Sequence, residues 1–350
     1  MLRAPRVAFR ADGAPAIGRG HLARCRNLAS ALRDLGVSST FVRRGPRDDM
    51  DLSGEVHWIA EESLRAGADV EEDALLTGAV LTALGADVVV VDHYALGAEW
   101  EASIGRSGTP VVVIDDLADR VHACDLLIDA NPLGAGRYAG LVDPVTRLLT
   151  GPRYALIDPT LARFGATTRG TTPARMLVSL GGGSTIEALE RLLPSVGDPR
   201  LRELAVDVVV GDEDAVARVQ EVCARLRSPA DAPIRVHGWV SDLPDLMRTA
   251  DLCLGAGGIS TWERMRLGLP SVVVAVAENQ ESTSIALGRE GLIRYAGRLE
   301  RLTATSVADL LVDLAGDVAA RSDMARRGPE VVDGAGAERC AREVLGLLAT

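Results

Sequence analysis

The run Val88-Val89-Val90-Val91, followed at once by Asp92-His93-Tyr94, decides the fold class of this chain. Consecutive β-branched residues leave neither face of a strand polar, as in a strand that helices cover on both sides. Three further stretches share this character: residues 111–114 and 272–276, and residues 206–210 apart from Asp207. Stretches of helical length separate them, at residues 22–35, 73–84, 186–193, 214–226, 262–267 and 282–290. This alternation predicts an α/β fold with parallel sheets.

The chain is long enough for two such domains. Its 350 residues exceed what one core usually fills, so we expect two domains of about 150 residues each. Turn-forming residues without periodicity occupy residues 151–153 and 167–173, and a new strand begins near residue 175. We therefore predict Rossmann-like domains at 1–155 and 174–334, a linker at 156–173 and a C-terminal helix at 335–350. The helix could pack on either domain, and the active site is expected in the cleft between them.

Composition excludes several classes of function. Lys and Arg number 38 and Asp and Glu 49, so the formal net charge is −11. Nucleic acids and anionic membranes bind through Lys and Arg, which argues against both partners. A small basic patch, Arg43-Arg44 with Arg47, is the one candidate for docking at a membrane.

The cysteines and the apolar segments indicate a soluble cytoplasmic protein. Five cysteines form no CxxC pair and suit no closed disulfide framework, so we expect reduced, mostly buried thiols. Residues 1–9 lack the apolar core of a signal peptide, and no apolar run reaches the ~18 residues that span a bilayer. A monomer is the default expectation for the oligomeric state.

A histidine between a glycine pair and a helix is the first candidate for catalysis. The motif Gly18-Arg19-Gly20-His21 also fits a dinucleotide fingerprint of the G-x-G-x-x-A kind. Residues 11–17 separate it from the preceding strand, however, and the next strand ends at Arg43-Arg44 instead of an acidic residue, which argues against NAD. The glycines allow a ligand to approach, and the positive end of the helix dipole favours a neutral His21 that can accept a proton. A purely structural His21, packed at the turn, is the alternative.

A glycine-rich loop in the second half is the candidate phosphate site. Gly255-Ala256-Gly257-Gly258-Ile259-Ser260-Thr261-Trp262-Glu263 follows a strand-like stretch and leads into a helix. The free N–H groups of such a first turn bind phosphate without lysine or metal. Glu263 either complements the helix dipole or holds the two hydroxyls of a ribose. A tight turn is the alternative reading of the glycines.

Polar residues also end two strands, at Asp92-His93-Tyr94 and Asp115-Asp116, where open parallel sheets bind ligands. No third ligand accompanies the aspartate pair, and residues 48–51 suit a solvated loop, so we expect no metal and no other cofactor. We leave three histidines as structural: His57, His122 and His237. The strand end at 237–240 could pair its backbone with a nucleotide base.

At these residues the chain resembles the UDP-2,4-diacetamido-2,4,6-trideoxy-β-L-altropyranose hydrolases of pseudaminic acid biosynthesis, relatives of the MurG-type glycosyltransferases. The matching stretches span both halves of the chain. They are Gly18-x-Gly20-His21-x-x-Arg24-Cys25; Val91-Asp92-His93-Tyr94; residues 115–120 with 124–129; residues 151–156; and residues 255–263 running through Leu267-Gly268-Leu269-Pro270 to Glu278-Asn279-Gln280.

The resemblance implies a glycosyltransferase-B architecture and cleavage of the bond between the anomeric carbon and UDP. By analogy, His21 is the catalytic base that activates water, Glu263 contacts the ribose and residues 257–261 hold the diphosphate. The predicted substrate-binding residues are Asp12, Gly18, Gly20, Tyr94, Asn279 and Gln280. The predicted UDP-binding residues are Trp239, Val240, Gly257, Gly258, Ile259, Ser260, Thr261 and Glu263.

Three departures from the family pattern leave the sugar open. Asp158-Pro159-Thr160-Leu161 stands where the family reads Arg-Pro-Glu-Phe, the loop at 181–185 lacks an aspartate, and Ala130 replaces a polar residue. The function expected from the sequence is a metal-independent, inverting UDP-sugar hydrolase. The alternatives are a glycosyltransferase of the same fold, a UDP-sugar 2-epimerase that hydrolyses, and a non-catalytic UDP-sugar sensor.

Overall fold

The chain forms two compact α/β units. The computed structural model describes residues 3–13, 20–45, 47, 50–52, 54–62, 64, 69–165, 169–181, 186–238, 240 and 242–348. The first unit comprises Met1–Pro159 together with Ala335–Thr350, and the second comprises Thr160–Gly334. The division after Pro159 falls within the stretch that we expected to be a linker.

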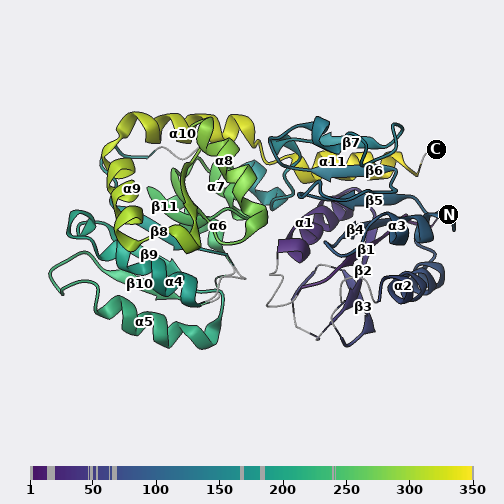
Figure 1. The fold of residues 1–350 in the computed structure, drawn as a ribbon, viewed down its shortest axis with the longest axis horizontal. Helices are drawn as coiled ribbons and strands as arrows, with labels where there is room; N and C mark the ends of the chain where they lie inside the picture. Colours follow the sequence, from purple (N-terminus) through teal and green to yellow (C-terminus); the bar gives the residue numbers. More distant parts are fainter. Residues whose placement is uncertain are drawn as a thin grey trace. The chain divides into compact units, whose positions relative to one another are not determined.

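The first unit is built on a seven-stranded sheet with the strand order β3-β2-β1-β4-β5-β6-β7, in which every described pair is parallel (Figure 1). Its strands are β1 (Arg6–Ala11), β2 (Ser38–Arg44), β3 (Glu55–Ala60), β4 (Val88–Asp92), β5 (Val111–Ile114), β6 (Leu126–Asp129) and β7 (Arg147–Thr150). Its helices are α1 (Gly20–Asp34), α2 (Val70–Leu84), α3 (Ala98–Gly105) and α11 (Gly336–Gly346).

Strand β4 shows why the first sheet is apolar on both faces. Val88 and Val90 join a buried cluster with residues of α1 and α11, whereas Val89 and Val91 join a second cluster with residues of α2 and α3. Alternate side chains of one strand therefore supply two cores, as the unbroken valine run predicts. The C-terminal helix α11 packs on this first unit, through Cys340 among others, which settles the choice that the sequence left open.

The second unit repeats the architecture with six strands in the order β10-β9-β8-β11-β12-β13, all parallel where described. The strands are β8 (Arg175–Ser179), β9 (Ala205–Val209), β10 (Ile234–His237), β11 (Leu252–Ala256), β12 (Ser271–Ala275) and β13 (Arg294–Arg298). The helices are α4 (Ile186–Leu192), α5 (Val216–Ala224), α6 (Leu243–Thr249), α7 (Ser260–Arg266), α8 (Glu281–Arg289), α9 (Ala304–Gly316) and α10 (Val318–Val331). The predicted fold class, two Rossmann-like domains, is confirmed.

The strand orders locate the ligand sites. In each sheet the order reverses direction at one point, between β1 and β4 in the first unit and between β8 and β11 in the second. Connections that leave two neighbouring strands toward opposite faces open a crevice at their carboxyl ends, where ligands bind in open parallel sheets. Helix α1, which carries His21, is the next element after β1, Asp92 ends β4, and the glycine-rich loop lies at the end of β11.

The described helices do not include one that is both long and apolar enough to cross a membrane. The expected cytoplasmic location and monomeric state stay predictions.

Candidate functional site

A histidine–aspartate pair occupies the switch point of the first sheet. His21 lies in the first turn of α1, and Asp92 is the last residue of β4. The His21 Nδ1 atom lies 2.5 Å from Asp92 Oδ1, and only 5% of His21 and none of Asp92 is exposed. Because β1 and β4 are neighbours in the sheet, residues that are 71 positions apart meet at their carboxyl ends.

Arg24 holds the Asp92 carboxylate from the next turn of α1. Its Nε donates to Asp92 Oδ2 at 2.5 Å, and its Nη2 donates to Oδ1 at 2.6 Å. Its Nη1 donates to Asp116 Oδ2 at 2.8 Å, which extends the network to the loop after β5. Burial acts to raise the pKa of Asp92, but Arg24 and His21 together hold that pKa well below its usual range. Asp92 is therefore ionised under all ordinary conditions.

This network determines which nitrogen of His21 carries the proton. An ionised carboxylate only accepts hydrogen bonds and a guanidinium only donates them. The Nδ1 atom must therefore be the N–H that donates to Asp92, and its 3.1 Å separation from Arg24 Nη2 reflects two donors that share one oxygen. In the neutral ring, Nε2 is then left with its lone pair, the form in which a histidine acts as a general base.

Tyr94 packs against the histidine ring. The two ring centroids are 4.4 Å apart in an edge arrangement, and the Tyr94 hydroxyl donates to Asp116 Oδ2 at 3.2 Å. Burial and the neighbouring Asp116 raise the pKa of Tyr94, so that the phenol stays protonated. Tyr94, predicted to line a sugar pocket, thus lies beside the candidate base, where it fixes the orientation of the imidazole.

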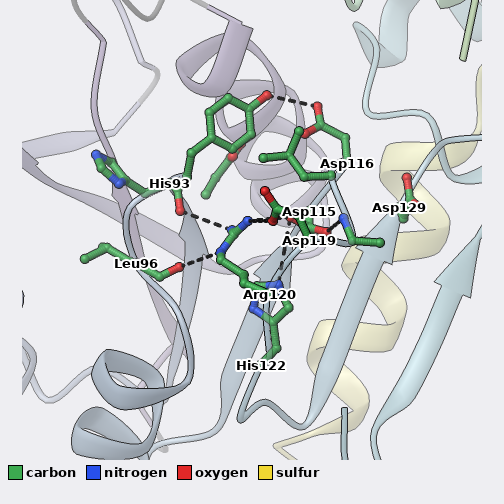
Figure 2. A network of polar contacts seen from close by, with 12 residues as sticks. His93, Leu96, Asp115, Asp116, Asp119, Arg120, His122 and Asp129 are labelled. Carbon is green, nitrogen blue, oxygen red and sulfur yellow. Dashed lines mark hydrogen bonds and ion pairs between the residues drawn. The ribbon is translucent and has the colours of Figure 1, made fainter. Parts of the chain in front are cut away.

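A single arginine joins the two loops that carry these residues (Figure 2). Arg120 donates from Nε to the carbonyl oxygen of Leu96 at 3.2 Å and from Nη2 to that of His93 at 3.4 Å. Its Nη1 pairs with Asp115 Oδ1 at 3.1 Å. The loop after β4 and the loop after β5 are therefore held together, and Asp115 serves this clamp while its neighbour Asp116 faces Arg24.

Asp12, predicted to bind substrate, lies in a buried network with Arg10, and its Oδ2 is 3.4 Å from Nε2 of His93, the residue between Asp92 and Tyr94. Its Oδ1 accepts from Arg10 Nη1 at 2.6 Å and from the backbone N–H of Arg44 at 2.7 Å, and the residue is 4% exposed. A substrate contact by Asp12 stays a prediction.

Two residues of the small candidate patch, Arg43 and Arg44, do not lie on the surface, because they are 1% and 6% exposed. Arg43 stacks on Trp58 at 4.3 Å, and Arg44 donates to the carbonyl of Glu62, so neither guanidinium is available to a membrane.

The second unit brings the glycine-rich loop and Gln280 together. A Cβ added to Gly257 would lie 2.6 Å from Ser284 Oγ and 3.0 Å from Gln280 Cβ, so only glycine allows this approach. Gln280 Oε1 accepts from the backbone N–H of Val276 at 3.0 Å, while its Nε2 lies 3.7 Å from a Cβ built on Gly258. The carboxamide oxygen is therefore occupied, and its NH₂ group faces the loop.

For the other predicted site residues, the structure gives fewer contacts that bear on their predicted roles. Gly20 begins α1 with open space around it, Asn279 precedes Gln280 in a 3₁₀ turn, and Val240 is half-buried. Thr261 donates to the carbonyl of Ala256 at 3.1 Å, and Glu263 lies in the first turn of α7. Gly18, Trp239 and the loop at 182–185 lie outside the described residues. Among the residues that are described, no group of three or more His, Cys, Asp or Glu could hold a metal ion.

Sequence analysis placed Asp92 and Asp116 at strand ends where ligands bind, but it assigned no role to either residue or to Arg24. The available signal was the spacing His21-x-x-Arg24-Cys25, which places these side chains one turn apart on the same helix face. Cys25 donates to Asp92 Oδ2 at 3.6 Å, and burial raises the pKa of its thiol, so it acts as a buried neutral donor.

Comparison with known proteins supports the fold and gives distant relatives. No family model matches the chain. The spore coat polysaccharide biosynthesis protein SpsG of Bacillus subtilis is 22% identical over 337 residues, which cover 94% of this chain and 95% of SpsG. The UDP-2,4-diacetamido-2,4,6-trideoxy-β-L-altropyranose hydrolase of Campylobacter jejuni is 25% identical over 154 residues, 43% of this chain and 52% of that protein.

Solved structures match over almost the whole chain. MurG of Acinetobacter baumannii superimposes with a TM-score of 0.69 at 15% identity, covering 98% of this chain and 100% of that one. A UDP-glucosyltransferase from Polygonum tinctorium gives 0.69 at 13% identity with 99% of each chain covered. The UDP complex of S. aureus MnaA gives 0.63 at 12% identity, covering 99% of this chain and 98% of that one. The fold is that of the glycosyltransferase-B class.

Proposed function

We propose that this chain is a UDP-sugar-dependent glycosyltransferase in which His21 deprotonates the acceptor hydroxyl. The observation that carries the proposal is the Asp92–His21 pair, which leaves His21 Nε2 as a proton acceptor at the switch point of the first sheet. Neighbours named as glycosyltransferases and as a UDP complex, together with a relative named for polysaccharide biosynthesis, support a sugar nucleotide as the substrate.

In the proposed reaction, an acceptor oxygen attacks the anomeric carbon of the sugar. The bond from that carbon to the β-phosphate oxygen breaks, UDP leaves with the electron pair, and the acceptor proton moves to His21 Nε2. Attack opposite the leaving group inverts the anomeric configuration. The imidazolium that forms is stabilised by the ionised Asp92 beneath it.

The second unit would hold the nucleotide. We assign the diphosphate to Gly257–Thr261, the ribose hydroxyls to Glu263, the base to the segment around Trp239 and Val240, and the sugar to Asn279 and Gln280. The NH₂ group of Gln280, which faces Gly258, is a suitable donor to an oxygen of the sugar or the β-phosphate. UDP needs charge stabilisation to leave, more than it needs protonation, and backbone N–H groups with fixed donors supply it.

Hydrolysis is the second candidate, in which water replaces the acceptor. It is favoured by the relative from Campylobacter jejuni, whose name is that of a hydrolase, and by the matching stretches from Gly18 to Gln280. The Asp92–His21 pair suits both reactions, because a water and a sugar hydroxyl present the same proton to the base. The sugar expected in that case carries the 2,4-diacetamido-2,4,6-trideoxy pattern.

One assay separates the candidates. UDP release is measured from a panel of UDP-sugars, including UDP-N-acetylhexosamines and UDP-2,4-diacetamido-trideoxy-hexoses, with and without a mixture of glycan acceptors. Release that requires the acceptor supports the transferase, and release at the same rate without it supports the hydrolase. Tight binding of a UDP-sugar without any release of UDP would overturn both candidates and would indicate a non-catalytic UDP-sugar sensor.

A further inference from the structure

Arg264 lies buried directly beneath the glycine-rich loop. It is 1% exposed, and its Nη1 donates to Ser260 Oγ at 2.9 Å. Its Nη2 donates to the carbonyl oxygen of Ala256 at 2.7 Å and to Thr261 Oγ1 at 3.0 Å. A Cβ on Gly255 would lie 2.6 Å from the guanidinium carbon, so the glycine provides the space for this side chain. The guanidinium thus supports the loop from inside the unit.

The hydrogen bonds of Arg264 within the described residues do not include one to a carboxylate. Its described partners are two hydroxyls and a carbonyl, all neutral, and Nε has no hydrogen-bond partner among the described residues. Burial lowers the pKa of Arg264, with Glu263, the next residue in the chain, opposing that effect. A buried guanidinium that hydrogen-bonds only neutral oxygens is costly, and an anion that binds nearby lowers that cost.

Arg264 also determines how the Ser260 hydroxyl is oriented. Because a guanidinium only donates, Ser260 Oγ accepts from Arg264, and its own hydrogen must point away from the guanidinium. No described residue accepts that hydrogen. Thr261, by contrast, accepts from Arg264 and donates to the carbonyl of Ala256, so its hydroxyl is fully used. Ser260 is therefore left as a donor at the start of α7.

We propose that Arg264 is a positioning residue for the diphosphate of the bound nucleotide: it fixes Ser260 as a hydrogen-bond donor to a phosphate oxygen, and the bound diphosphate adds a negative charge that its neutral hydrogen-bond partners do not supply. This inference rests on the proposed function, because it takes a nucleoside diphosphate as the ligand. The inference adds Arg264 to the proposed diphosphate site as a buried cation that acts without direct contact with a phosphate oxygen.

The chain offers a matched control two residues away. Arg266 is also on α7 and 9% exposed, and it donates to the backbone carbonyls of Leu161, Ala162 and Phe164. It is a structural arginine that bonds a neighbouring segment and does not contact the loop. A general effect of losing a buried arginine from α7 will appear at both positions, whereas an effect on the diphosphate will appear only at Arg264.

The test compares the binding of UDP and of uridine to the full chain and its variants, by calorimetry for UDP and saturation-transfer NMR for uridine. We expect Arg264→Met to weaken UDP binding about 10- to 100-fold and to leave uridine binding unchanged, since only UDP carries the charge. Ser260→Ala should weaken UDP binding about tenfold, and the double variant should lose less than the product of the two single losses. Arg266→Met should leave the ratio of the two affinities unchanged.

The outcomes distinguish this inference from the function on which it rests. If the wild-type chain binds no UDP, the proposed function fails. If it binds UDP and Arg264→Met binds it equally well, or loses UDP and uridine affinity in parallel, only the role of Arg264 is overturned. Should Arg264→Met fail to fold, Ser260→Ala alone decides: a selective loss for UDP supports the inference, and unchanged UDP binding overturns it.

Discussion

Two arginines, one at the switch point of each sheet, are held in opposite ways. Arg24 donates to two carboxylates, those of Asp92 and Asp116, whereas Arg264 donates only to neutral oxygens among the described residues. Burial acts to lower the pKa of both. At Arg24 the two carboxylates outweigh burial and raise the pKa, and at Arg264 burial prevails and lowers it.

The difference shows what each unit is built to do. The first network is electrostatically closed, because every charge has its partner, and it fixes one tautomer and one orientation of His21. The second is electrostatically open, because the described hydrogen bonds of its buried guanidinium all go to neutral oxygens. A closed network suits a general base, and an open one suits the binding of an anion.

The largest expected effect comes from removing the base of the closed network. His21→Ala should lower turnover by about 10²- to 10⁴-fold, the usual loss with a general base, while UDP affinity stays unchanged. The measurement is UDP release together with UDP titration. His57→Ala, at a half-buried position on β3, is the matched control and should keep full turnover. Full turnover of His21→Ala would remove the residue from the chemistry.

The next test replaces the buried carboxylate of the closed network, Asp92. Asp92→Asn offers Nδ1 an amide that can donate as well as accept, so the base tautomer is no longer enforced, and turnover should fall by up to about 10⁴-fold. UDP affinity should again be unchanged. The loss should appear at every pH from 6 to 9, since the low pKa of Asp92 keeps the wild-type carboxylate ionised throughout. Recovery of the wild-type rate at any pH in this range contradicts the tautomer assignment.

Removing each arginine in turn tests whether the two sites differ in their electrostatics. Arg24→Met leaves two buried or partly buried carboxylates without their cation, so the free energy of unfolding should fall by about 3–5 kcal/mol. Arg264→Met leaves no carboxylate behind and should cost less than about 1 kcal/mol in the absence of ligand. Urea unfolding of both variants measures this, and equal losses would show that the two sites are electrostatically alike.

The smallest expected effect concerns Asp129, at the end of β6. Burial raises the pKa of its carboxyl from 3.8 to about 6, although Asn131 and Arg137 oppose that rise. A raised pKa in the folded state means that the associated stability is present at acid pH and is lost as the pH rises through about 6. Asp129→Asn removes the cost of ionisation, so the variant's free energy of unfolding minus that of the wild type should be about 2–3 kcal/mol larger at pH 8 than at pH 4, which means that the variant is relatively more stable at pH 8.

Chemical denaturation at the two pH values checks the Asp129 prediction. Asp125→Asn provides the control. Asp125 lies just before the same strand, and its carboxylate accepts a hydrogen bond from the backbone N–H of Val111. A difference between wild type and Asp129→Asn that does not change with pH would show that folding does not raise the pKa of this carboxyl.

Much of the fold and part of the site could be predicted because their signals are local. Valine runs, glycine-rich loops and a histidine at the start of a helix each occupy a few consecutive residues, and strand ends mark ligand sites in any parallel sheet. The pairs Asp92–Arg24 and Asp116–Arg24 could not be found in this way, since their members are 68 and 92 positions apart and meet only through the strand order. Arg43 appears basic and exposed in sequence, but its stacking on Trp58 depends on the pairing of β2 with β3.

By itself, then, the sequence determined the two-domain α/β class and placed His21 and the loop at 255–263 at strand ends, because backbone propensity and hydrophobic period act over short distances. The tertiary structure alone decided three things: that α11 returns to the first unit, that Asp92 fixes the His21 tautomer, and that the described hydrogen bonds of Arg264 go only to neutral oxygens. Each of these depends on which side chains are buried together. In an interior of low polarity, the partners of a charged group decide how that group behaves.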